Sequence, residues 1–182
     1  MNRKPAGPCI IRAANLLDAR AIARIHWSGW QATYAGILDR KYLASMTIGK
    51  TESYLKGLFK GKSSCAGMFV AIDRGSREVI GFIHGGAIRK AVADHRGEIY
   101  AFYVSPERRG CGVGKKLFAR MTSWFRAEGF GSFALWVLRD NPSRDIYEVL
   151  SGVCCGEDKV RIGKRLYPVS AYAWKIPARR SA

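Results

Sequence analysis

The stretch Glu98–Glu128, EIYAFYVSPERRGCGVGKKLFARMTSWFRAE, decides the fold of this chain. Its first part, Ile99–Val104, is apolar and rich in aromatic residues, which predicts a strand buried on both faces. A glycine-rich loop follows at 108–114, and apolar residues then recur at helical spacing as far as Phe125. Gly129 is placed to end that helix. The stretch therefore predicts a strand, a loop and a helix in succession.

The loop between the predicted strand and helix is suited to bind phosphate. Glycines lack a Cβ atom, so backbone N–H groups can approach an anion closely. The helix that follows directs the positive end of its dipole toward the same place. Basic side chains add charge there, at Arg108, Arg109, Lys115 and Lys116. The alternative is an ordinary strand-to-helix turn with a solvated basic rim.

The spacing of the loop excludes two common nucleotide-binding motifs. A Walker A loop would need a glycine where Arg109 stands and a hydroxyl side chain where Lys116 stands. The dinucleotide fingerprint G-x-G-x-x-G fails because the glycines fall at positions 110, 112 and 114. The pattern that does match is R-x-x-G-x-G, formed by Arg109, Gly112 and Gly114. It resembles the acetyl-CoA pyrophosphate loop of the GNAT superfamily of N-acetyltransferases.

Three further segments resemble the same family, so the resemblance covers residues 9–176. Residues 11–38, IRAANLLDARAIARIHWSGWQATYAGIL, are similar to a bacterial subgroup with W-x-x-x-Y-x-G-I after its first helix. Residues 135–152, LWVLRDNPSRDIYEVLSG, and 160–174, VRIGKRLYPVSAYAW, resemble the later motifs of that subgroup. The chain departs from the family pattern at packing positions and at one turn glycine, namely at Ser143, Ile146, Val153 and Lys164.

The resemblance implies an α/β (α+β) architecture, the GNAT fold. This fold has a central mixed, splayed sheet of about six or seven strands with helices on both faces. Residues 9–176 would form a single N-acetyltransferase domain, and residues 1–8 and 177–182 would be short basic tails. Independently of the resemblance, the order of strand, helix and strand over residues 99–138 predicts a right-handed parallel crossover.

The start of the first long helix is also marked in the sequence. Asn15 can cap a helix, with Asp18 at the reciprocal position of a capping box. Beyond the cap, the spacing places Leu17, Ala21, Ile25 and Ser28 on one side of the helix, with Ile22 beside them.

The resemblance assigns groups that would bind the co-substrate acetyl-CoA. Its pantetheine arm would enter where strands 99–104 and 133–138 part, within reach of backbone groups of Phe102 and Val104 and of Asn141. Main-chain N–H groups of the loop would bind the pyrophosphate. The full set expected at the co-substrate is Phe102, Tyr103, Val104, Arg109, Gly110, Cys111, Gly112, Val113, Gly114, Lys115, Asn141 and Tyr147.

Acyl transfer to an amine needs a base for the amine proton and an acid for the leaving thiolate. Glu98 matches a glutamate that serves as general base in some family members, and it could act directly or through a water. The alternative for Glu98 is a charged residue at an exposed strand end. Tyr147 is the expected acid, because the ordinary tyrosine pKa of about 10 keeps it protonated at neutral pH. The alternative for Tyr147 is a core tyrosine.

Attack by the amine would be direct, in a ternary complex, so Cys111 is interpreted as a loop residue and not as a nucleophile. Trp27, Trp30 and Tyr34 cluster where this fold usually builds its acceptor pocket, although core packing explains at least one of them. The acceptor itself stays open: a small primary amine, an amino acid, an antibiotic or a protein amine would each fit. The excess of positive charge favours an acceptor with a carboxylate or phosphate over a polycation.

The formal net charge of +17 supports a competing function. A basic protein attracts polyanions, so a nucleic-acid-binding protein is the first alternative. The basic residues are spread along the chain, however, and no helix-turn-helix or RNP pattern organises them. A GNAT-like sensor that binds acyl-CoA without catalysis is the second alternative. The terminal hairpin could also pair across a homodimer.

Composition places further expectations on the chain. The five cysteines contain no C-x-x-C pair, so we expect thiols in a reducing cytoplasm and no metal site. No stretch approaches the roughly 20 apolar residues of a membrane span. The apolar run after the basic N-terminus is stopped by Arg12, which is too early for a signal peptide.

Overall fold

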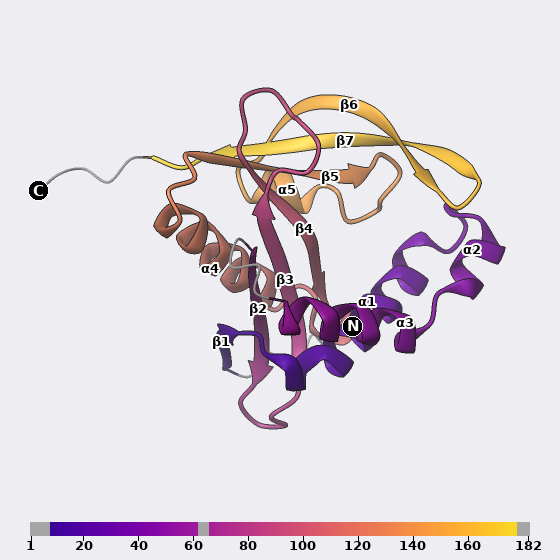
Figure 1. The fold of residues 1–182 in the computed structure, drawn as a ribbon, viewed down its shortest axis with the longest axis vertical. Coiled ribbons are helices and arrows are strands. Elements are labelled where there is room, and N and C mark those ends of the chain that lie inside the picture. Colours follow the sequence, from indigo (N-terminus) through magenta and orange to yellow (C-terminus); the bar gives the residue numbers. More distant parts are fainter. Residues whose placement is uncertain (1–7, 62–65, 178–182) are drawn as a thin grey trace, which may run out of the picture.

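Seven strands form one mixed sheet at the centre of the computed structural model, which describes residues 8–61 and 66–177 (Figure 1). The strands are β1 (Cys9–Ala13), β2 (Ala66–Asp73), β3 (Val79–Ala87), β4 (Gly97–Val104), β5 (Ser132–Leu138), β6 (Val153–Ile162) and β7 (Arg165–Lys175). Their order in the sheet is β1-β2-β3-β4-β5-β7-β6. Neighbouring strands are antiparallel, except that β4 and β5 are parallel. The predicted mixed sheet is therefore confirmed.

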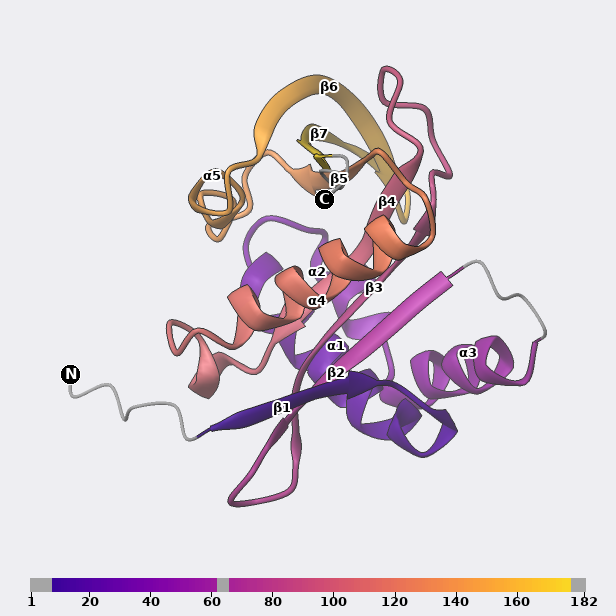
Figure 2. The same cartoon turned by 90° about the vertical axis from the view of Figure 1, so that its left-hand side faces the viewer.

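Helices cover both faces of the sheet, as Figure 2 shows. They are α1 (Ala19–Tyr34), α2 (Arg40–Ser45), α3 (Ile48–Lys60), α4 (Val113–Ala127) and α5 (Ile146–Val149). Helix α4 packs on one face, in a core with side chains of β2 to β5 and β7. Helices α1 and α3 pack on the opposite face, against β2 and β3. The prediction of helices on both faces is confirmed.

Helix α4 follows the predicted pattern closely. Val113, Leu117, Met121 and Phe125 are all buried, as their helical spacing requires. Phe125 stacks on Phe133 of β5, with ring centroids 4.7 Å apart. Burying each large apolar side chain contributes about 1.5–3 kcal/mol, so this face fixes the start of α4 relative to the sheet.

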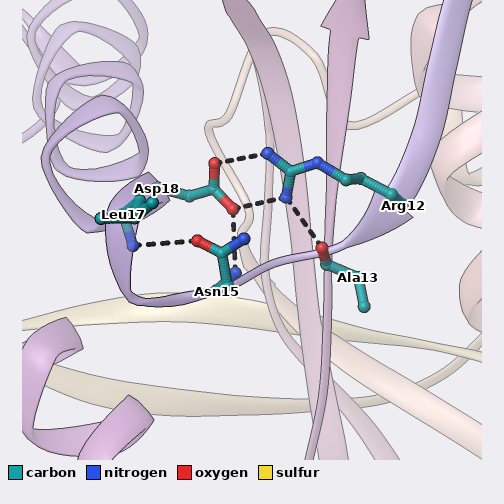
Figure 3. A network of polar contacts seen from close by, with 5 residues as sticks. All are labelled: Arg12, Ala13, Asn15, Leu17 and Asp18. Atoms are coloured by element: carbon teal, nitrogen blue, oxygen red, sulfur yellow. Dashed lines mark hydrogen bonds and ion pairs between the residues drawn. The ribbon is translucent and has the colours of Figure 1, made fainter.

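The predicted capping box forms ahead of α1 (Figure 3). The side chain of Asn15 accepts a hydrogen bond from Leu17 N–H, and Asp18 Oδ2 accepts one from Asn15 N–H at 2.9 Å. Arg12 donates to both oxygens of Asp18, at 2.6 and 2.8 Å. Leu17 does not share the buried face of α1, since 89% of this residue is exposed. Residues 16–18 form a 3-10 turn, and the buried face begins only after it.

Strand β4 carries a bulge at Tyr100. His84 of β3 pairs with Ala101, but the next residue, Gly85, pairs with Ile99, so Tyr100 is an extra residue on β4. A single inserted residue reverses the alternation of side chains between the two faces. The alternation of side chains between the two faces therefore changes at the bulge, so that the parts of β4 before and after it do not follow one regular pattern.

Strands β4 and β5 pair only at the start of β4. The paired residues are Gly97 with Phe133 and Glu98 with Ala134, and beyond them the two strands part. Strand β5 continues along β7, whereas β4 continues along β3. As a result residues 100–104 are half-buried, in contrast to the predicted strand buried on both faces. The splay that the sequence predicted is present.

The β6–β7 hairpin extends across the sheet and reaches α2 at its tip (Figure 1). Tyr167 Oη accepts a hydrogen bond from the backbone N–H of Asp39 at 3.0 Å. Arg165 Nη2 lies 3.7 Å from the side-chain carboxylate of the same aspartate. These contacts fix the hairpin tip to the segment that begins α2. No helix within residues 8–61 and 66–177 is long and apolar enough to cross a membrane.

Candidate active site

A cavity of about 490 Å³ opens where β4 and β5 part. Residues 99–104 of β4 form one wall, and Leu135–Val137 of β5 form another. The glycine-rich loop and the segment from Asn141 to Val149 complete the lining. Pockets of this size bind small molecules and cofactors. Backbone edges that are not paired with each other thus face a cavity that ends at the start of α4.

The glycine-rich loop adopts the backbone conformation that its glycines allow. Gly110 and Gly112 have φ of 73° and 79°, in the left-handed region that disfavours other residues. Gly112 directly precedes α4, whose first backbone N–H groups have no partner within the helix. A Cβ on Gly114 would lie 3.3 Å from the ring of Phe102, so this glycine also allows close packing of the helix on β4. The arrangement suits a phosphate group.

The two arginines at the start of this loop have different partners. Arg109 donates through Nη2 to Thr33 Oγ1 and through Nε to the Val104 carbonyl oxygen, at 3.4 Å each. Arg108 forms an ion pair with Asp73 at 3.0 Å. Arg109 therefore connects the loop to α1, and Thr33 is a cavity residue that the sequence analysis did not single out.

Three tyrosines line the cavity with raised pKa values. Burial is the main cause for Tyr34, Tyr103 and Tyr147 alike, because an apolar environment disfavours the charged phenolate. The ring of Tyr147 packs against Tyr172 and Trp174, with centroids 5.6 and 6.3 Å away. All three phenols remain protonated at neutral pH, so each can donate a hydrogen bond or a proton.

Asn141 orders the segment between β5 and α5. Its Nδ2 donates to Tyr34 Oη at 3.2 Å, and its Oδ1 accepts from the backbone N–H of Ser143 at 2.8 Å. One side chain thus connects α1 to the segment that leads into α5, the helix that carries Tyr147. Asn141 lines the cavity, as does Tyr147.

Glu98 is buried and bound to an arginine. Its Oε1 accepts from Arg89 Nη2 at 2.6 Å, and its Oε2 accepts from the Arg89 backbone N–H at 2.8 Å and from Nε at 3.2 Å. Glu98 is 4% exposed, so it does not resemble a solvated residue at a strand end. Arg89 is not identifiable from the sequence, because no local feature marks which acid a loop arginine will bind.

Most of the residues expected at the co-substrate line the cavity. They are Phe102, Tyr103, Val104, Arg109, Gly110, Gly112, Gly114, Lys115, Asn141 and Tyr147. Among the described residues, the lining does not include Glu98, Cys111 or Val113. Val113 is buried in the α4 core, and Cys111 Sγ lies 3.6 Å from the carbonyl oxygen of Arg109.

The three aromatic residues expected in the acceptor pocket have different positions. Tyr34 lines the cavity, whereas Trp27 and Trp30 lie outside it. Trp30 packs between Tyr34 and His26, with centroids 5.0 and 5.6 Å away, and Trp27 is partly exposed. Among the described residues, no group of three or more His, Cys, Asp or Glu side chains is arranged to hold a metal ion. Cys65 lies outside the described residues.

Comparisons with known proteins agree with this geometry. The profile of the Acetyltransferase (GNAT) family matches residues 22–152. YuaI of Bacillus subtilis (strain 168), described as an uncharacterized N-acetyltransferase, is 36% identical over 161 residues, which span 87% of this chain and 89% of that protein.

Solved structures share the fold at low sequence identity. The PaiA N-acetyltransferase of Thermoplasma acidophilum, solved in complex with coenzyme A, superposes with a TM-score of 0.67 at 20% identity, over 90% of this chain and 98% of that one. A ribosomal-protein-alanine N-acetyltransferase of Brucella melitensis gives 0.70 at 19% identity, over 92% and 99%. The family match and the curated relative together show that this chain is an N-acetyltransferase of the GNAT family.

Proposed function

We propose that the protein transfers the acetyl group of acetyl-CoA to a primary amine by direct attack in a ternary complex. The observation that carries the proposal is the parting of β4 and β5 beyond Glu98, which opens a cavity that ends at the glycine-rich start of α4. Acetyl-CoA, when bound, supplies an activated acyl group and an anionic pyrophosphate. For the pyrophosphate, the cavity offers backbone N–H groups and glycines in the left-handed conformation.

The residues proposed for the co-substrate act through the main chain and through charge. N–H groups from Arg109 to Gly114 bind the pyrophosphate, with Lys115 adding positive charge. Backbone groups of β4 near Phe102 and Val104 bind the pantetheine arm, and a backbone N–H there stabilises the charge that develops on the thioester oxygen. Asn141 orders the far wall of the cavity through its bond to Tyr34.

Tyr147 is the proposed acid for the leaving thiolate. It lines the cavity, and burial raises its pKa, so its proton is retained over the neutral range. A thiolate that takes this proton leaves as a neutral thiol, which prevents the reverse attack. The neighbouring rings of Tyr172 and Trp174 hold the Tyr147 ring in place.

Glu98 is the proposed base for the amine proton, acting directly or through a water. Arg89 binds its carboxylate and also covers it. Glu98 can therefore take a proton only when an incoming amine reaches the carboxylate that Arg89 now binds. Its neighbour Tyr100 lines the cavity, so the pair lies beside the space proposed for the reaction.

Release of free thiol from acetyl-CoA, measured against a panel of primary amines, tests this proposal. We expect amine-dependent release by the wild type. Glu98→Gln should show a reduced rate that recovers partly at high pH, because more of the amine is then already deprotonated. If no amine in a broad panel raises thiol release above the rate without amine, transfer to amines is refuted.

A further inference from the structure

The segment between β3 and β4 places two successive cations over aromatic residues of the cavity. The guanidinium carbon of Arg89 lies 4.0 Å from the ring centre of Tyr100, and Lys90 Nζ lies 5.3 Å from that of Trp136. Both Tyr100 and Trp136 line the cavity, one on each of the strands that part. Each of the two cations therefore lies against an aromatic residue that lines the cavity.

Each of these cations has an acidic partner, but the two partners differ in burial. Lys90 pairs with Asp158 of β6, and both side chains are about half exposed. The Arg89 side chain is 61% exposed, whereas the Glu98 side chain that it binds is 5% exposed. Arg89 thus forms the outer layer over a buried carboxylate, and the ion pair can be opened from the solvent side.

The ion pair between Arg89 and Glu98 can open only if another positive charge takes the place of Arg89. A buried carboxylate left without a cation is strongly unfavourable, so whatever displaces Arg89 must bring a positive charge to Glu98. A simple ammonium would satisfy Glu98, but it would lie beside the displaced guanidinium as a like charge. An acceptor that also carries a carboxylate would pair with Arg89 at the same time, and one ion pair would be exchanged for two.

From this exchange we propose that the acetyl acceptor is a small amino acid, with its ammonium on Glu98 and its carboxylate on Arg89. This inference rests on the proposed function and names its substrate class. The planar guanidinium suits a carboxylate, because it can donate two parallel hydrogen bonds. Binding of the acceptor then does two things at once, since it uncovers the base and delivers the amine to it.

The reaction balances with these groups. Glu98 takes one proton from the ammonium and later releases it to solvent. The amine nitrogen forms a C–N bond with the thioester carbonyl carbon as the C–S bond breaks, and the nitrogen loses its second proton. Tyr147 gives a proton to the departing thiolate, and the second proton of the amine replaces it. The products are an N-acetyl amino acid, the free thiol and one proton.

The test compares each L-amino acid with its amide and with its decarboxylated amine, by thiol release from acetyl-CoA. For the wild type we expect kcat/KM about tenfold or more higher for at least one amino acid than for its two neutral-ended counterparts. Arg89→Gln should raise KM for that amino acid about tenfold or more and abolish the preference. Arg89→Lys keeps the positive charge but cannot donate two parallel hydrogen bonds to a carboxylate. It should therefore retain part of the preference for the amino acid.

Arg96→Gln is the matched control, because it removes an exposed arginine from the same segment. It should leave the preference unchanged. Calorimetric binding of acetyl-CoA should be the same in all variants, and thermal unfolding shows whether each is folded. If Arg89→Gln does not fold, the wild-type preference and Arg89→Lys still decide the question.

The remaining outcomes separate this inference from the proposed function. Equal or better acetylation of amides and decarboxylated amines would overturn the amino-acid acceptor and leave amine acetylation standing. Binding of acetyl-CoA without acetylation of any amino acid would also overturn it. Failure to bind acetyl-CoA would refute the proposed function itself, and the inference with it.

Discussion

At the scale of single residues, burial determines the protonation of the side chains around the cavity. Tyr34, Tyr103 and Tyr147 are shifted in the same direction, toward the neutral phenol. Glu98 differs from them in its contacts, because its carboxylate accepts hydrogen bonds from a guanidinium and from a backbone N–H. Neutral proton donors therefore line the cavity, whereas the carboxylate that Arg89 binds lies outside the lining.

Tyr147→Phe tests the proposed acid. The change removes one hydroxyl and keeps the ring that packs against Tyr172 and Trp174. We expect kcat to fall by about 100-fold or more, with the Kd of acetyl-CoA unchanged, because the thiolate must then leave unprotonated. Steady-state thiol release and calorimetry measure the two quantities.

Tyr172→Phe is the control for this prediction. It deletes a neighbouring hydroxyl that donates to Glu148 at 3.1 Å, and Tyr172 is not a residue of the proposed proton path. Its kcat should stay within a few-fold of the wild type. A similar fall in kcat for both variants would mean that Tyr147 acts through packing.

Two partly buried histidines predict a loss of stability in mild acid. Burial lowers the pKa of His26 and of His84 to about 4, from an ordinary 6.5, with Arg89 adding to the shift at His84. A histidine with a depressed pKa stabilises the fold above pH 6.5, and this contribution is lost as the pH falls toward 4. At pH 5 the loss is about 2 kcal/mol for each histidine, which urea unfolding at pH 7.5 and pH 5 measures.

His26→Phe should reduce this pH dependence by about half. Trp30, Phe82 and Tyr103 surround the His26 ring, so a phenyl ring fits the chemistry of the site. An unchanged difference in unfolding free energy between the two pH values would show that His26 does not remain neutral in the folded state.

At the scale of elements, the glycines at the two ends of α4 offer a matched pair of variants. Gly112 and Gly129 stand at the two ends of α4, both with φ of 79°, and a Cβ would meet no atom within 4 Å at either. Alanine should therefore cost about 1 kcal/mol of stability at each, through backbone strain alone. We expect Gly112→Ala to weaken acetyl-CoA binding, and Gly129→Ala to bind it as the wild type does.

Thermal unfolding and calorimetry of the two variants measure these effects. Equal Kd values for Gly112→Ala and Gly129→Ala would contradict a phosphate site at the start of α4. Equal losses of both stability and affinity would instead mean that helix strain, and not the loop itself, controls binding.

The elements were predictable where the signal is local. The strand that became β5, the capping box at Asn15 and the buried face of α4 follow from periodicity and from turn chemistry. The exposure of Leu17 was not predictable, because a 3-10 turn ahead of α1 changes the helical phase, and the sequence pattern does not reveal this turn.

Features that depend on partners distant in the sequence were not predictable. The bulge at Tyr100 arises from the register between β3 and β4, and one extra residue leaves no mark in an apolar strand. The pairing of Glu98 with Arg89 depends on how the segment after β3 folds back. Trp27 and Trp30 lie on the correct helix, but their positions around α1 direct them away from the cavity.

At the scale of the whole molecule, the net charge of +17 raises the alternative of nucleic-acid binding, which salt dependence distinguishes from acetyl-CoA binding. Binding to nucleic acid would rest on many phosphate contacts, and its affinity would fall by about 10³–10⁵ between 50 and 200 mM salt. We expect the affinity for acetyl-CoA to change by less than about tenfold over the same range, because shape and backbone hydrogen bonds add to charge. Parallel titrations at the two salt concentrations measure this, and an equally steep fall would favour the polyanion-binding alternative.

Calorimetric titration with acetyl-CoA at moderate salt, with ATP as the charge control, tests the central claim most directly. The claim is that the cavity between β4 and β5 is a specific site for acetyl-CoA. We predict one-to-one binding of acetyl-CoA with a Kd of about micromolar order, and much weaker binding of ATP. Binding of ATP as tight as that of acetyl-CoA would contradict the claim, since the loop would then attract phosphates through charge alone.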